Sequence, residues 1–158
     1  MNRKVYIAGL TLHPDQRWMS QIARNVTMAD WGVLALGQDL MHDRDGKYCP
    51  AFQHIIDKAG VTRMPLPARL PNLHAFAERW VRSVKDEALS RLILFGEASL
   101  RHVLKEYAMH DHTERNHQGK GNVLLFPLSS LGAKPPASLQ CRTRLGGMLK
   151  YYHHGEAA

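Results

Sequence analysis

Prolines in the middle of the sequence set the first limit on how this chain folds. Pro65, Pro67 and Pro71 lie within seven residues. Proline fixes its own φ, lacks a backbone N–H and disfavours a helical conformation in the residue before it. Residues 64–71 therefore form a stiff connection rather than part of a helix, and the regular elements must lie on either side of it.

Short apolar runs before this connection predict three strands. Val5–Leu10 is typical of a buried strand. Trp31–His42 contains a second strand, which we place at its end around residues 40–42, and residues 61–64 form a brief third one. The polar turn Asp43–Gly46 follows the second strand.

Apolar residues at helical spacing predict a helix between successive strands. One helix covers residues 18–26 and begins near Asp15, and another covers residues 52–59 and ends at Gly60, a residue suited to a helix C-terminus. Because strands alternate with helices, we expect an α/β fold in which helices pack against a sheet.

Two further helices are predicted after the connection. Asn72 caps the first, and the second covers residues 100–108. Residues 123–158 have no regular pattern and are interpreted as a C-terminal extension. The first helix has an apolar stripe formed by Leu73, Phe76, Ala77, Trp80, Val81 and Val84.

Composition narrows the classes of protein to consider. The 158 residues suit one domain, and 21 Lys and Arg against 14 Asp and Glu give a net charge of +7. This excess favours a polyanionic partner such as nucleic acid, although basic surfaces are also common without one. Cys49 and Cys141 form no CxxC motif, and no apolar run approaches the length of a membrane span. We therefore expect a cytoplasmic protein with free thiols and no membrane partner.

Two carboxylates stand out as a candidate metal pair. Asp43 follows a predicted strand, and Glu78 lies 35 positions later in the helix after Pro71. Carboxylates on rigid elements suit hard cations such as Mg²⁺. Two such ions about 3.5–4 Å apart can activate an attacking oxygen and stabilise a leaving one in phosphodiester chemistry.

The helix that carries Glu78 also carries cations on the same side. Arg82 and Lys85 lie on the face opposite the apolar stripe, together with Glu78. This arrangement suits a metal-binding carboxylate whose neighbouring cations contact the phosphates of DNA. The alternative is an ordinary solvated face with a Glu78–Arg82 ion pair.

Three segments resemble the core of bacterial insertion-sequence transposases, which belong to the DDE superfamily together with retroviral integrases. They are His42–Tyr48, Leu66–Lys85 and Glu114–Gly119. The resemblance implies a ribonuclease H-like fold, with residues 1–122 as an integrase-like catalytic core and residues 123–158 as the extension.

The resemblance also implies a function. Asp43 matches the second acidic residue of the family's triad and Glu78 the third, while Asp45 is a weaker competitor for the second place. These carboxylates would bind two Mg²⁺ or Mn²⁺ ions, and Arg82 and Lys85 would face DNA. The implied reaction is DNA integration or transposition by cleavage and strand transfer. Its partners are element ends and target DNA, and the active form is a homo-oligomer that associates with the nucleoid.

One departure from the family concerns the first acidic residue of its triad. The family's first acidic residue lies on the opening strand of the sheet, two strands before the one that Val5–Gly9 resembles. Asp15, Asp30 and Asp39 precede Asp43, and none of them lies on such a strand. We therefore expect a fold that lacks its first two strands, hence a truncated transposase. The alternative is an inactive transposase remnant or an accessory DNA-binding protein.

Three smaller features leave alternatives open. One is a histidine-rich stretch, which is either a metal site or the end of a helix whose dipole favours histidine; its histidines are His110, His112 and His117. The second is a basic and aromatic C-terminal segment, which is either a DNA-binding tail or a surface strand pair; it contains Arg142, Arg144, Lys150, Tyr151 and Tyr152.

The third feature is the set of three tryptophans, which are expected to anchor the core rather than to stack on bases: Trp18, Trp31 and Trp80.

Overall fold

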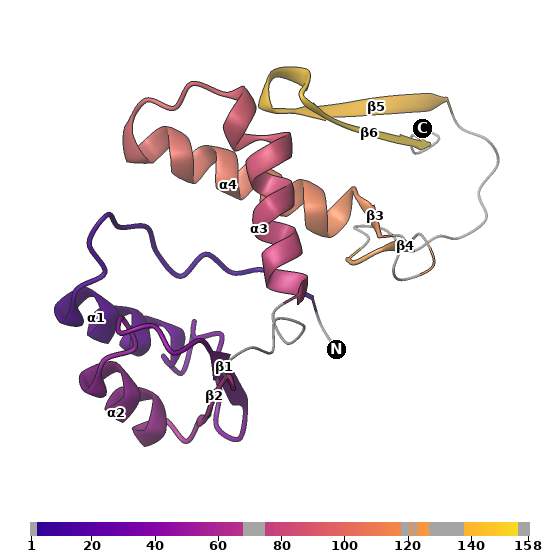
Figure 1. Cartoon of the computed structure of the whole chain (residues 1–158). Coiled ribbons are helices and arrows are strands. Elements are labelled where there is room, and N and C mark those ends of the chain that lie inside the picture. The colour runs from indigo at the N-terminus through magenta and orange to yellow at the C-terminus, as the bar shows by residue number, and fades with distance from the viewer. Residues whose placement is uncertain (1–2, 68–74, 118–120, 122, 127–137, 155–158) are drawn as a thin grey trace. The chain divides into compact units, whose positions relative to one another are not determined.

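The computed structural model describes residues 3–67, 75–117, 121, 123–126 and 138–154 (Figure 1). The chain forms two compact units, which we name the N-terminal unit (residues 6–76) and the C-terminal unit (residues 1–5 and 77–158). The predicted boundary between residues 122 and 123 falls inside the second unit. That boundary follows from the resemblance and stays a prediction.

The N-terminal unit contains two helices and a two-stranded parallel sheet. Its elements are α1 (Gln16–Val26), β1 (Asp39–His42), α2 (Pro50–Lys58) and β2 (Thr62–Pro65). The register pairs Asp39 with Thr62 and His42 with Pro65, so α2 is the crossover of a βαβ unit. The second and third predicted strands and the first two predicted helices are therefore confirmed.

Local chemistry explains where these helices begin and end. The Asp15 side chain accepts the backbone N–H of Trp18 at 2.7 Å, which is a helix N-cap. Pro50 occupies the first turn of α2, where its missing N–H costs nothing. Gly60, with φ of +74°, follows the last turn of α2 and turns the chain toward β2.

A small apolar core holds the N-terminal unit together. It lies between α1, α2 and the start of β2, and half-buried neighbours such as Leu34 and Leu40 pack around it. Burying side chains of this size is the main favourable term in folding. Its buried members are Met19, Ala23, Phe52, Ile56 and Val61.

The predicted strand over Val5–Leu10 is wrong. These residues form no strand, and a Cβ on Gly9 would lie 2.8 Å from the side chains of both Trp18 and Ile22. Residues 6–10 therefore contribute a segment that lies close to α1. Val5 belongs to the other unit, where its N–H donates to His112 Nε2 at 2.9 Å. An apolar run signals burial, but a strand also requires a partner with free backbone groups.

The C-terminal unit is built around two helices and a hairpin. α3 (Ala75–Glu87) and α4 (Gly96–Thr113) correspond to the two helices predicted after the prolines, and the predicted cap Asn72 lies outside the described residues. The remaining elements are η2 (Leu89–Arg91), β3 (Asn116–His117), β4 (Val123–Leu124), β5 (Leu139–Arg144), η4 (Leu145–Gly147) and β6 (Leu149–His154).

Polar contacts join α3 to the end of α4. Arg115 donates through both terminal nitrogens to the Glu87 carboxylate at 2.8 Å, and Tyr107 donates its hydroxyl to the same carboxylate at 3.1 Å. Trp80 lies edge-on to the Tyr107 ring, with centroids 5.9 Å apart. Burial raises the pKa of Tyr107, so its phenol stays protonated and keeps donating.

The hairpin β5–β6 packs on α4 through one of its two faces. Leu149 is 5% exposed, and Arg144 binds Glu106 and Glu114 of the α4 region at 2.7–2.9 Å. The described strands form three separate two-stranded sheets, so the chain is a mixed α/β protein. The ribonuclease H-like class stays a prediction. Within the described part, no helix has both the length and the apolar character needed to cross a bilayer.

Candidate functional site

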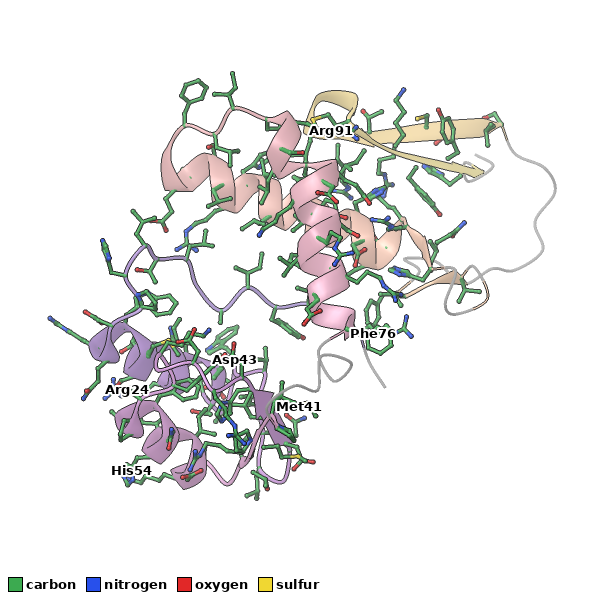
Figure 2. The ribbon with its side chains drawn as sticks, in the orientation of Figure 1. Arg24, Met41, Asp43, His54, Phe76 and Arg91 are labelled. Atoms are coloured by element: carbon green, nitrogen blue, oxygen red, sulfur yellow. The ribbon has the colours of Figure 1, made fainter. Side chains whose placement is uncertain are left out.

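Asp43 lies immediately after β1, at the point where the sheet ends (Figure 2). Its side chain is 53% exposed. One carboxylate oxygen accepts the backbone N–H of Asp45 at 3.4 Å, and the other lies 3.6 Å from Lys47 Nζ. The structure thus presents this predicted ligand at a strand end with oxygens that water can reach.

Lys47 offsets the negative charge of the Asp43 and Asp45 carboxylates in this turn. Its ammonium binds Asp45 at 3.0 Å, and its backbone N–H donates to the same carboxylate at 2.9 Å. The backbone bond and then the side-chain bond lower the pKa of Asp45. Asp45 is therefore committed to closing the turn, which favours Asp43 as the residue available to a ligand.

His42 precedes Asp43 and was not identified from the sequence. Its Nδ1 lies 2.7 Å from the Asp43 carbonyl oxygen, so Nδ1 carries the proton and donates it. Its Nε2 is buried and has no hydrogen-bond partner among the described residues. The ring packs on Tyr48 with centroids 4.6 Å apart. The imidazole thereby fixes the backbone carbonyl of the candidate ligand.

Glu78 lies in the first turn of α3, where the helix dipole favours a negative charge. Its side chain is exposed, as are those of Arg82 and Lys85 on the same face. Among the ion pairs of the described residues none includes Glu78, so the alternative Glu78–Arg82 pair is not formed. This face of α3 presents one carboxylate and two cations to solvent.

Asp43 and Glu78 belong to different units. In the described ranges, no three His, Cys, Asp or Glu side chains form a group able to hold a metal ion. The joint binding of metal by Asp43 and Glu78 stays a prediction. Asp43 carries oxygens suited to Mg²⁺ or Mn²⁺, and so does Glu78.

The histidine-rich stretch has protein partners instead of a metal arrangement. His110 Nδ1 lies 3.0 Å from the Glu114 carboxylate, and His112 Nε2 accepts the N–H of Val5. His117 Nε2 lies 2.8 Å from the Asp111 carbonyl oxygen. Each imidazole thus has a partner within the fold; His110 and His112 lie in the last turn of α4, and His117 lies in β3.

Glu114 is the centre of an ion cluster that sequence reasoning did not find. Its side chain is 1% exposed and binds Arg144 and His110, with Arg142 at 3.5 Å. Burial alone raises the pKa of this carboxyl, but the hydrogen bonds from Arg144 and His110 outweigh it and lower the pKa to about 2. The two arginine partners lie 28 and 30 residues further along the chain, too far for helical spacing to reveal them.

The excess of positive charge belongs mainly to the C-terminal unit. This unit contains 14 Lys and Arg against 8 Asp and Glu, whereas the N-terminal unit contains 7 against 6. Several of the acids bind arginines inside the fold, as Glu87, Glu106 and Glu114 do. The exposed cations of α3 therefore belong to a unit whose field attracts polyanions.

Comparison of the chain with protein-family models, with curated proteins and with solved structures gives no match.

Proposed function

We propose that this protein acts in DNA integration or transposition, by metal-dependent cleavage of a phosphodiester bond followed by strand transfer. Asp43 and Glu78 are the metal-binding carboxylates, and Arg82 and Lys85 contact DNA phosphates. The observation that carries the proposal is the exposed face of α3, where Glu78 stands beside cations without being paired to them. The resemblance of the segments around Asp43 and Glu78 to DDE transposases supports the same reaction.

The residues have separate tasks in this reaction. Asp43 follows a strand and Glu78 lies in a helix, and their carboxylate oxygens are of the kind that Mg²⁺ and Mn²⁺ prefer. Bound Mg²⁺ or Mn²⁺ supplies the polarisation that makes water or a DNA 3′-hydroxyl nucleophilic. Arg82 and Lys85 position the strand through its phosphates and carry no sequence information of their own.

An assembly of several copies follows from the proposal, since two element ends and a target must be handled together. The partners are therefore DNA and other copies of the chain.

The second candidate is an accessory DNA-binding protein or an inactive remnant of a transposase. The observation that favours it is Lys47, whose ammonium lies 3.6 Å from Asp43 and 3.0 Å from Asp45. A cation already held between two carboxylates competes with a metal ion for the same oxygens. In this case the basic face of α3 binds DNA without cleaving it.

Cleavage of labelled DNA separates the two candidates. The full chain is incubated with end-labelled duplexes that cover the sequences flanking its gene, with Mg²⁺, Mn²⁺, Ca²⁺ or EDTA. We expect products only with Mg²⁺ or Mn²⁺. Asp43→Asn and Glu78→Gln each lower the rate at least about a hundredfold, because the metal contributes several kcal/mol to catalysis.

Matched carboxylates on the same elements serve as controls. Asp45→Asn tests the neighbouring acid of the turn, and Asp86→Asn tests an exposed acid of α3. Both variants retain activity if Asp43 and Glu78 are the ligands. A salt-dependent mobility shift without metal-dependent products favours the second candidate.

A further inference from the structure

The hairpin β5–β6 has a second face whose described side chains are exposed. In an antiparallel pair, directly opposed residues lie on the same face and successive residues alternate between faces. Cys141 pairs with Tyr152, and Thr143 pairs with Lys150, so these four residues share one face with Leu139. We call this set, Leu139, Cys141, Thr143, Lys150 and Tyr152, the outer face.

The two faces differ in burial near the turn of the hairpin. On the inner face Leu149 is 5% exposed, and the Arg144 side chain is 15% exposed and bound to acids of the α4 region, whereas Gln140 and Arg142, further from the turn, are exposed. On the outer face Tyr152 is 59% exposed and Leu139 is 67% exposed. The hairpin is thus docked through one face, while the other presents an aromatic ring to solvent.

Charge determines which partner suits this face. Residues 138–154 contain two arginines and one lysine but no Asp or Glu. Lys150 is exposed and lies two residues from Tyr152 on the same strand, hence about 7 Å away on the same face. An aromatic ring with a cation one step along a strand matches a base and its backbone phosphate.

We propose that the outer face binds single-stranded nucleic acid, with a base stacked on Tyr152 and a phosphate held by Lys150. Stacking on a ring requires an unpaired base, since the bases of a duplex are covered by their neighbours. Every base has a π face, so the binding is tolerant of sequence and open to both DNA and RNA. This inference does not rest on the proposed chemistry at Asp43 and Glu78.

Fluorescence anisotropy of labelled oligonucleotides tests the proposal in EDTA, which excludes cleavage. The full chain is titrated with oligothymidylate and oligouridylate of about 15 nucleotides, a length within the range that single-strand sites cover. We expect the affinity for these oligonucleotides to fall as the salt concentration rises. When Arg82 and Lys85 are both replaced by Gln, the protein should bind the single strand more tightly than a duplex of equal length. The DNA and RNA arms show which of the two sources is preferred.

Variants of the ring decide whether stacking contributes. Tyr152→Ala weakens binding about five- to hundredfold, the range for one base–aromatic stack, and Tyr152→Phe retains most of it. Phe95→Ala is the matched control, because Phe95 is an aromatic residue of the same unit that is 81% exposed and precedes α4 in the sequence. Equal effects of Tyr152→Ala and Phe95→Ala overturn the proposal.

Variants of the cation decide whether a phosphate is held beside the ring. Lys150→Gln reduces the slope of log affinity against log salt by about 0.7, as expected for one phosphate of a single strand. Lys105→Gln removes an exposed lysine of α4 and leaves the slope unchanged.

Two other results overturn the proposal in favour of a different occupant. If oligoglutamate displaces the oligonucleotide at an equal concentration of charge, the occupant of the outer face is an acidic peptide. If the chain self-associates, and Tyr152→Ala abolishes this association without changing oligonucleotide affinity, the occupant is a second copy of the chain. Affinity is measured in EDTA, where no metal-dependent cleavage occurs, so failure here is distinguishable from failure of the proposed cleavage.

Discussion

The Glu114 carboxylate is almost completely buried and is held by side chains from two elements. His110 reaches it from the preceding turn of α4, and Arg144 reaches it from β5. A buried charge is tolerated only when it is paired and hydrogen-bonded. Removing one partner leaves the other charge buried, without the interactions that offset its desolvation. The stability of the C-terminal unit therefore depends on the ionisation of this residue.

Acid is expected to weaken the C-terminal unit through Glu114. The folded-state pKa of about 2 lies below the ordinary value of 4.5, so the native state releases this proton more readily than the unfolded state. The resulting stabilisation is complete above about pH 4.5 and is lost as the pH falls toward about 2. Hydrogen exchange of α4 amides measures it, and the exchange free energy of Glu114→Ala should be lower by about 3 kcal/mol at neutral pH.

Glu97→Gln is the control for this measurement. Glu97 pairs with Arg101 four residues away, but both side chains are more than half exposed. Exposed pairs of this kind contribute about 0.5 kcal/mol or less. Similar losses in the two variants would contradict the view that burial makes Glu114 important.

Single residues show how far the sequence alone could lead. Asp43 and Glu78 were identified as acids on a strand end and a helix, and that is where they lie. The contacts of Glu114 and the carbonyl held by His42 could not be predicted. The contacts of Glu114 with Arg142 and Arg144 depend on a hairpin that packing brings to α4, and the sequence does not show which atom the His42 ring contacts.

Helical periodicity predicted the helices well, because it reports on one face of one element. The polar side of α3 is exposed as expected, whereas Phe76 and Val81 of its apolar stripe are 49% and 44% exposed. Trp31, expected in the core, is 79% exposed. Periodicity thus predicts which side of a helix faces inward. How far that side is buried depends on which other segments pack against it.

The C-terminus of α2 depends on glycine at position 60. Gly60 has φ of +74°, where other residues are strained, and an added Cβ would overlap Leu36 Cδ1. Gly60→Ala should therefore destabilise the N-terminal unit by about 1–2 kcal/mol. Thermal unfolding or hydrogen exchange of α2 amides reports the loss.

Gly46→Ala provides the comparison, since a Cβ there meets nothing within 4 Å and φ is not positive. It should be neutral or slightly stabilising, because alanine restricts the unfolded chain more than glycine does. An equal loss from both substitutions would show that the left-handed conformation at Gly60 is not the cause.

Across the whole molecule, charge is distributed unevenly between the two units. The C-terminal unit carries the excess of cations, so duplex DNA should bind mainly through it. Replacing Arg82 and Lys85 together by Gln should reduce the slope of log affinity against log salt by about 1.8 for duplex DNA, since each phosphate contact contributes about 0.9. Electrophoretic mobility shifts at several salt concentrations measure this slope.

The control replaces two exposed arginines of α1, Arg17 and Arg24, by Gln. The net charge changes equally, but we expect the slope to stay near that of the unaltered protein. If both double variants lower the slope alike, the protein binds DNA through its overall charge and the face of α3 has no special role.

The ion cluster at the end of α4 also orders events during synthesis. The ribosome completes α4 and Glu114 before it adds Arg144, 30 residues later. Until then the carboxylate has only His110 and water, and the inner face of the hairpin does not yet exist. The C-terminal unit therefore cannot reach its final state until Arg144 has been added, whereas the N-terminal unit contains its buried apolar residues by Leu66.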